Sequence, residues 1–173
     1  MTYNFAEMFS RQVIAERVKE LAVEINADYE GQEVVLVCIL KGAAVFMSDL
    51  MRHLTVDVKV EYMQLCSYEG ENSRGKIKMD LDVSDDIFGN NVIVVEDIID
   101  TGGTIEFIRA HLMTKKPATV KFCVLLDNPV RRNEGCEKAD YVGFVIPNQF
   151  VFGYGLDYNG KYRNLPYIAA LTR

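Results

Sequence analysis

Two runs of consecutive apolar, mostly β-branched residues constrain the fold of this chain more than any other feature. Residues 34–40 read Val-Val-Leu-Val-Cys-Ile-Leu, and residues 92–95 read Val-Ile-Val-Val. Neither run has the polar alternation of a strand with one face in water. Such strands are typically buried on both faces, as in a parallel sheet covered by helices on each side. The runs therefore predict an α/β fold.

Segments with helical periodicity separate these runs and support the same fold class. Ser10 precedes a segment in which apolar residues recur every three or four positions up to Ile25, so we expect a capped helix there. Two further helices are expected over residues 43–54 and 104–114. Strands are expected at residues 33–40, 56–65, 79–83, 92–95, 119–126 and 141–146.

Length and composition indicate one globular domain. The 173 residues are 49% apolar and 25% charged, which is ordinary for a globular protein. No run approaches the roughly 18 apolar residues of a membrane-spanning helix, and residues 1–10 lack the features of a signal peptide. The formal net charge of −6 argues against broad contact with nucleic-acid phosphates. We expect a single domain over residues 1–173, with no membrane or nucleic-acid partner.

The cysteines indicate a reducing compartment. The chain has four cysteines and no Cys-x-x-Cys pair, so neither a zinc site nor a disulfide framework is expected. Cys38 and Cys123 lie in apolar runs, where thiols usually behave as small buried side chains. We therefore expect a cytoplasmic protein.

The segment from Val94 to Thr104 carries the strongest functional signal. It reads Val-Val-Glu-Asp-Ile-Ile-Asp-Thr-Gly-Gly-Thr and leads from a buried strand through a glycine turn into a helix. Ligands of open α/β sheets bind outside the carboxyl ends of the strands. The amides of residues 101–104, together with two threonine hydroxyls, form a candidate cradle for a terminal phosphate. The spacing matches neither a P-loop nor a dinucleotide-binding motif.

Three acids accompany this cradle, and they would repel a bare phosphate. We therefore expect them to meet hydroxyls, a cation or a Mg²⁺ ion that bridges to phosphate. Glu96 and Asp97 are adjacent and suit ribose hydroxyls or a hydrated Mg²⁺. Asp100 lies on the turn itself, where it is free to exchange a proton with a substrate atom. An ordinary helix cap would explain Asp100 alone, but not an acidic pair at the end of a buried strand.

This segment resembles the signature of the purine/pyrimidine (type I) phosphoribosyltransferases, whose donor is phosphoribosyl pyrophosphate (PRPP). Residues 39–43, 67–68 and 143–163 are similar to the hypoxanthine-guanine branch of that family. The resemblance implies a central, mostly parallel sheet flanked by helices, with a small hood subdomain from about residues 127–173. It also implies a mobile catalytic lid over about residues 66–78 and a homodimer or homotetramer.

The resemblance assigns roles to individual residues. The acidic pair would hold the ribose hydroxyls and Mg²⁺, the third acid would transfer a proton at N7 of the base, and the peptide before Lys41 would be cis. The assigned residues are Asp100 for catalysis; Glu96, Asp97, Asp100, Thr101, Gly102, Gly103 and Thr104 for PRPP and its 5-phosphate; Leu40, Lys41, Gly42 and Arg163 for pyrophosphate; Ser67 and Tyr68 for the lid; Asn128, Phe150 (stacking), Val151 and Asp157 for the base; and Glu96, Asp97 and Asp157 for the metal.

Asn128 departs from the family pattern. Residues 125–129 read Leu-Leu-Asp-Asn-Pro, where the family has lysine in place of this asparagine to donate to the 6-oxo group of the base. An amide is shorter and uncharged, and it offers both a donor and an acceptor. Its oxygen suits a 6-amino group, whereas Arg131 or Arg132 would be able to supply the missing donor.

The resemblance implies a purine salvage enzyme. Its reaction would transfer the 5-phosphoribosyl group from PRPP to N9 of hypoxanthine, and of guanine, giving IMP or GMP and pyrophosphate. A preference for adenine or xanthine is one alternative. A PRPP-sensing regulatory protein that binds RNA or DNA is another, although the chain shows no added DNA-binding domain. An unrelated α/β phosphate-binding protein is the third.

Overall fold

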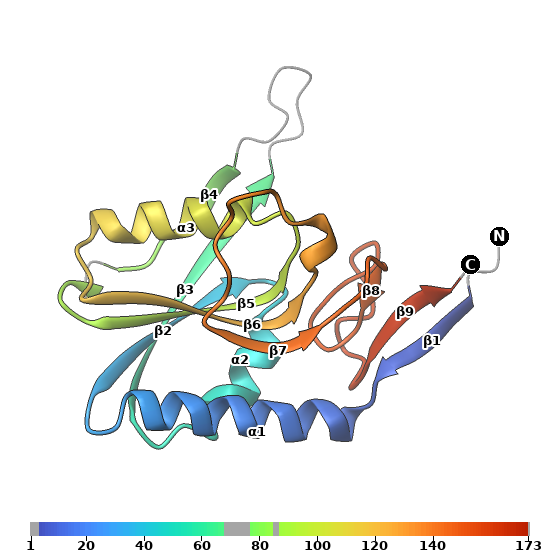
Figure 1. Ribbon diagram of the computed structural model, residues 1–173, viewed down its shortest axis with the longest axis horizontal. Coiled ribbons are helices and arrows are strands. Elements are labelled where there is room, and N and C mark those ends of the chain that lie inside the picture. Colours follow the sequence, from blue (N-terminus) through green and yellow to red (C-terminus); the bar gives the residue numbers. More distant parts are fainter. Residues whose placement is uncertain (1–3, 68–76, 85–86, 173) are drawn as a thin grey trace.

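The computed structural model describes residues 4–67, 77–84 and 87–172 (Figure 1). Within these residues no helix has the length and apolar character needed to span a membrane. The elements are β1 Asn4–Phe9, α1 Arg11–Asp28, β2 Glu33–Leu40, α2 Ala44–Met51, β3 Asp57–Ser67, β4 Ile77–Leu81, β5 Asn91–Ile99, α3 Gly103–Thr114, β6 Thr119–Asp127, the 3₁₀ turn η2 Pro129–Arg131, β7 Tyr141–Val145, β8 Val151–Phe152 and β9 Ile168–Thr172.

A six-stranded central sheet forms the middle layer of the molecule, in the order β4-β3-β2-β5-β6-β7. Strand β2 pairs in parallel with both β3 and β5, and the parallel pairing continues through β6 to β7. Strand β4, at one edge, pairs antiparallel with β3. The predicted α/β fold with a mostly parallel sheet is confirmed.

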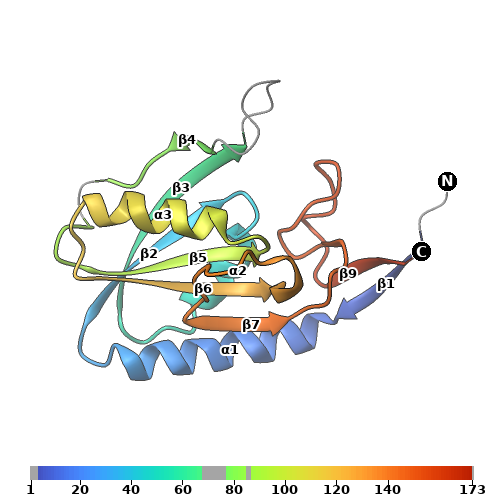
Figure 2. The ribbon, with the colours of Figure 1, turned by 45° about the horizontal axis from the view of Figure 1, so that its top comes forward.

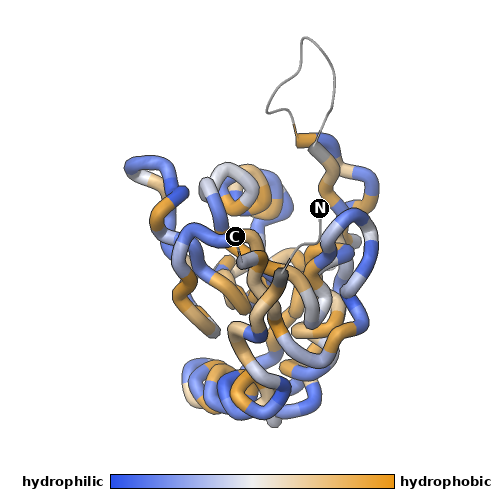
Figure 3. The backbone as a smooth tube through the Cα atoms, turned by 90° about the vertical axis from the view of Figure 1, so that its right-hand side faces the viewer, coloured by the Kyte–Doolittle hydropathy of each residue, from blue (hydrophilic) through white to orange (hydrophobic). Residues whose placement is uncertain are grey.

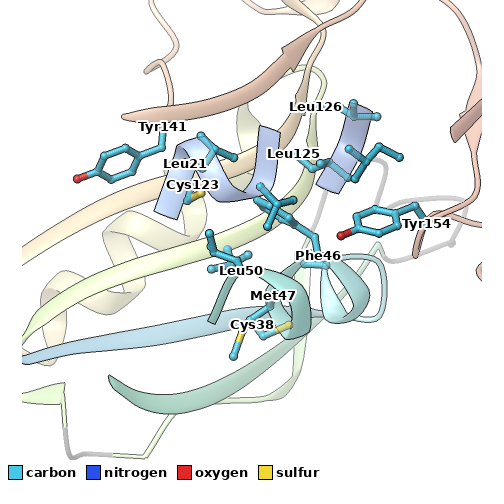
Figure 4. Close-up of a cluster of buried hydrophobic side chains, with 14 of the residues drawn as sticks. Leu21, Cys38, Phe46, Met47, Leu50, Cys123, Leu125, Leu126, Tyr141 and Tyr154 are labelled. Atoms are coloured by element: carbon cyan, nitrogen blue, oxygen red, sulfur yellow. The ribbon is translucent and has the colours of Figure 1, made fainter. Parts of the chain in front are cut away.

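Helices cover both faces of this sheet (Figures 1 and 2). On β2, Val34, Leu36 and Cys38 belong to the core shared with α1 and α2, whereas the alternate residues belong to the core beneath α3. Figure 4 shows the first core, where Phe46 and Leu50 of α2 lie near Leu21 of α1. Both faces of β2 are buried, which explains why its sequence lacks polar alternation.

Helix α1 forms as its sequence predicts. The Ser10 hydroxyl accepts a hydrogen bond from the Val13 amide at 3.3 Å, which caps the first turn. Buried residues recur along one face from Ile14 to Ile25, and in Figure 3 the helix, at the bottom, alternates between hydrophobic and hydrophilic positions.

Several element boundaries differ from the sequence-based expectations. Helix α2 ends at Met51 rather than residue 54, because tight turns follow in which the amide of His53 bonds to the carbonyl of Leu50. Strand β5 continues to Ile99, since its pairing with β6 extends that far. The acidic pair at residues 96–97 therefore lies inside the strand rather than after it.

The predicted lid at residues 66–78 is partly strand. Strands β3 and β4 pair up to Ser67 and Ile77, so β4 begins two residues earlier than expected and the ends of the predicted lid belong to a hairpin. The remainder, including Tyr68, lies outside the described residues.

A small second sheet, in the order β1-β9-β8, lies beyond the carboxyl ends of the parallel strands (Figure 1). Strand β1 pairs with β9 so that Phe5 lies opposite Leu171 and Ala6 opposite Ala170. This small sheet therefore joins residues 4–9, to which the sequence assigned no element, to two strands from the region of the predicted hood, residues 127–173.

Candidate active site

The candidate site lies where the strand order reverses. From the centre of the sheet, the chain passes from β2 through α2 to β3 in one direction, and from β5 through α3 to β6 in the other. Such a reversal opens a crevice at the carboxyl ends of the two central strands. A cavity of about 370 Å³ occupies this position, lined by Lys41 and Gly42 after β2, and by Asp97, Asp100 and Thr101 from β5 and its turn.

The loop after β2 lies directly against the acidic end of β5. The peptide between Leu40 and Lys41 is cis, as the family resemblance implies. A Cβ atom at Gly42 would lie 1.6 Å from Oδ2 of Asp97, and a Cβ atom at Gly155 would lie 2.2 Å from the carbonyl oxygen of Gly42. Three segments distant in sequence therefore meet too closely for any side chain at residue 42.

Glu96 is buried, the adjacent Asp97 is half-buried, and one oxygen of Glu96 lacks a hydrogen-bond partner. Oε1 of Glu96 accepts from the Asp97 amide at 3.2 Å, and Oδ1 of Asp97 accepts from the Ile98 amide at 2.7 Å. Oε2 of Glu96 is buried without a partner. Burial, reinforced by the neighbouring Asp97, raises the pKa of Glu96, and burial also raises the pKa of Asp97. The pair therefore favours the approach of a cation or a hydroxyl donor.

The predicted metal ligands do not form a closed metal site. Among the described residues, no group of three or more His, Cys, Asp or Glu side chains is arranged to hold a metal ion. Asp157 lines the same cavity, but its Oδ1 accepts from Nη2 of Arg163 at 2.5 Å. One or two carboxylates nevertheless fit Mg²⁺, which usually takes its other ligands from water and substrate phosphates.

The turn between β5 and α3 has the geometry of an anion cradle. Gly102 precedes the helix with a φ of 91°, and no side chain caps the helix N-terminus. The first amides of a helix have no partner within the helix, so these N–H groups are open to a ligand. Thr101 and Thr104 are exposed beside them. The predicted turn and helix start are confirmed, and their binding of a phosphate stays a prediction.

A second cavity, of about 440 Å³, adjoins the first. The predicted base-binding residues Asn128, Phe150, Val151 and Asp157 all line it. Phe150 is 50% exposed and meets the ring of Tyr158 edge-on at 5.4 Å. Asp97, Asp100 and Asp157 line both cavities, so Asp100 lies between the turn that opens α3 and the cavity lined by Phe150.

Two side chains from the segment that follows β6 contact the carboxylate of Asp100. Nδ2 of Asn128 lies 3.4 Å from its Oδ1, and Nη1 of Arg131 lies 2.7 Å from its Oδ2. Arg132 instead pairs with the buried Asp127. Of the two arginines that the sequence offered, the structure therefore brings Arg131 to the site.

Two further predicted residues are Arg163 for pyrophosphate and Ser67 for the lid. Arg163 lines the first cavity and also donates to the carbonyl of Gly155 at 2.6 Å. Ser67 ends β3, and its neighbour Cys66, to which the sequence motifs assign no role, lines the first cavity. Cys66 donates to Asp80 at 2.9 Å, a contact that no sequence pattern signals.

The four cysteines are free thiols, as expected. Cys38 and Cys123 are fully buried, and desolvation raises the pKa of Cys38 to about 12. Both thiols therefore act as apolar side chains in the core.

Comparison with known proteins agrees with this architecture. The phosphoribosyl transferase domain model matches residues 6–159. A crystal structure of a hypoxanthine-guanine phosphoribosyltransferase from Bacillus anthracis superimposes with a TM-score of 0.91 at 46% identity, covering 96% of this chain and 98% of that one. The hypoxanthine-guanine phosphoribosyltransferase of Streptococcus thermophilus is 42% identical over 165 residues, which are 95% of this chain and 91% of that protein.

A longer relative is also similar. The bifunctional protein TilS/HprT of Listeria innocua is 42% identical over 95% of this chain, and the match spans 25% of that protein's length. The sheet, the crevice where its strand order reverses and the proteins that it resembles together define an α/β transferase. The chain belongs to the phosphoribosyl transferase domain family.

Proposed function

We propose that the protein transfers the 5-phosphoribosyl group of PRPP to N9 of hypoxanthine, and of guanine, with release of pyrophosphate. The position of Asp100, between an uncapped helix N-terminus and the cavity that Phe150 lines, carries this proposal. A phosphoribosyl donor and a planar base would meet at this junction. The names of the similar proteins support a 6-oxopurine as the base.

In the proposed reaction, the bond between C1′ and the pyrophosphate oxygen breaks ahead of formation of the N9–C1′ bond. The amides of residues 101–104 hold the 5-phosphate, and residues 40–42 with Arg163 hold the pyrophosphate. The carboxylates of Glu96 and Asp97 stabilise the ribosyl cation and orient its hydroxyls. Asp100 accepts the proton from N7 of the base.

The buried, unpartnered oxygen of Glu96 supports the use of Mg²⁺. Glu96 and Asp97 would hold Mg²⁺, which would supply positive charge to neutralise the departing pyrophosphate. Phe150 stacks on the purine face, and backbone groups of Val151 and Asp157 meet its edge.

An ultraviolet assay of hypoxanthine, guanine, xanthine and adenine with PRPP and Mg²⁺ tests the proposal. We expect turnover of hypoxanthine, and of guanine, to the corresponding monophosphates. Turnover of adenine alone would contradict the assignment of a 6-oxopurine, and the absence of turnover with every base would contradict the transferase.

We infer a cytoplasmic location, since four free thiols suit a reducing compartment. We also propose a homodimer or homotetramer, as the family resemblance implies. Light scattering would then give two or four times the chain mass of 19.6 kDa, and a mass equal to one chain would contradict it.

A further inference from the structure

The wall of the base cavity beside Asp100 differs from the one that the family pattern implies. It holds a neutral amide, Asn128, and a guanidinium, Arg131, both bonded to the Asp100 carboxylate. Among the described residues that line this cavity, Arg131 is the one cation. Any charged donor to the base must therefore come from Arg131 rather than from residue 128.

Asn128 is poorly suited to bind a 6-oxo group by itself. Its side chain is 3% exposed, its Nδ2 is directed at Asp100, and its Oδ1 is buried without a partner. On a 6-oxopurine, N7 and the 6-oxo oxygen share one edge, so a base whose N7 meets Asp100 places that oxygen against this wall. Two acceptor oxygens repel each other, and reversing the amide would instead turn Oδ1 toward the Asp100 carboxylate.

Arg131 is able to satisfy both neighbours. Its guanidinium carries five N–H donors in a planar fork, and Nη1 is the nitrogen paired with Asp100. The side chain is 53% exposed at the cavity, so it can adjust when a base enters. We propose that Arg131 donates to the 6-oxo oxygen of the purine while it keeps its bond to Asp100, and that Asn128 is a positioning residue for that carboxylate. This inference rests on the proposed function.

Steady-state kinetics of Arg131→Gln test the inference. We expect kcat/KM for hypoxanthine to fall at least about tenfold, because a hydrogen bond from a charged donor is lost. Competitive inhibition by unsubstituted purine, which has no 6-oxo oxygen, should stay at the wild-type level. Lys138→Gln removes one exposed charge from the same region and should leave both values unchanged.

A rescue experiment separates a direct contact from an indirect one. In the Arg131→Gln background, Asn128→Lys should restore most of the lost kcat/KM for hypoxanthine, since it returns a cation to the same wall. In the wild-type background, Asn128→Lys should raise kcat/KM for hypoxanthine only slightly.

The outcomes distinguish the inference from the proposed function. A wild-type protein that turns over no 6-oxopurine would overturn the proposed function. The role of Arg131 alone would be overturned by two results, each with an active wild-type protein. In one, Arg131→Gln keeps its kcat/KM for hypoxanthine. In the other, Arg131→Gln weakens inhibition by unsubstituted purine by the same factor as its kcat/KM for hypoxanthine. Circular dichroism of each variant checks its folding, and Arg131→Lys, which keeps the charge, should retain part of the preference for hypoxanthine.

Discussion

The residue type at several positions of the site is constrained by the atoms that surround it and by the backbone conformation. Gly42 is required because the Asp97 carboxylate occupies the space of a side chain, and Gly102 because its φ is positive and Cys136 lies close. Glu96 is held in a position that burial makes unfavourable for its charge. Such local conflicts are typical of functional sites.

Gly42→Ala should weaken PRPP binding without unfolding the protein. The new Cβ atom would overlap Asp97 and displace either the loop or the carboxylate, with an expected loss of about tenfold in affinity. Isothermal titration calorimetry with Mg²⁺ and PRPP measures it. Gly31→Ala, with open space around the new Cβ atom, is the control. Unchanged PRPP affinity in Gly42→Ala would show that the contact with Asp97 does not matter.

Asp100→Asn should lower turnover far more than donor affinity. Removal of the proton acceptor is expected to reduce kcat about 100-fold or more, while the amides of the turn that face the 5-phosphate remain. Steady-state kcat and the dissociation constant of PRPP are the two measurements. A similar loss in both would argue that Asp100 binds the donor instead.

Secondary-structure elements are tied together by polar contacts at the opposite end of the sheet. Asp28 ends α1, and its Oδ2 accepts from the Tyr141 hydroxyl of β7 at 2.5 Å and from Lys121 of β6 at 2.9 Å. These contacts, the Tyr141 hydrogen bond most of all, hold the pKa of Asp28 below its usual value of 3.8. The ionised carboxylate is therefore favoured in the folded state.

Tyr141→Phe should destabilise the protein in a pH-dependent way. Because the pKa of Asp28 is lowered by folding, its stabilisation is present above the ordinary pKa and is lost as the pH falls through the lower value. We expect a loss of about 1 kcal/mol in the free energy of unfolding at neutral pH, and a smaller loss near pH 3. Urea unfolding at both pH values measures it, with the exposed Tyr62 of β3, changed to phenylalanine (Tyr62→Phe), as control. Equal losses at both values would refute the link.

The whole molecule combines a stable sheet with an unfavourable cluster of charges at the crevice where the strand order reverses. Strands buried on both faces supply the core, while the buried Glu96 and the half-buried Asp97 lie side by side near the carboxyl end of β5, where burial raises the pKa of both. The small sheet pairs β1 with β9 beyond the carboxyl ends of the parallel strands. Function at such a site is expected to oppose stability.

Glu96→Gln should stabilise the free protein and weaken donor binding. Loss of a buried charge beside Asp97 is expected to raise the free energy of unfolding by about 1 kcal/mol without ligand. Affinity for PRPP with Mg²⁺ should fall, and fall further in Glu96→Gln/Asp97→Asn. Urea unfolding and calorimetry measure the two effects, with the exposed Glu16→Gln as control. A variant less stable than wild type without ligand would contradict the explanation.

Local patterns were sufficient for the α/β class, the helices and the turn from Asp100 to Thr104. The apolar run in β2, the period of α1 and the glycines of the turn each act over a few neighbouring residues, so they are visible along the chain. The placement of the turn at the carboxyl end of the sheet followed from the same reasoning, whereas the acidic pair lies inside β5 rather than after it.

Contacts between distant segments could not be predicted in this way. The pairing of β1 with β9, the approach of Gly42 to Asp97 and the choice of Arg131 over Arg132 join residues that no periodicity connects. Each depends on which surfaces pack together, and therefore on the free energy of the complete fold. Local sequence specifies what a segment can form, whereas packing across the sheet sets which side chains meet Asp100.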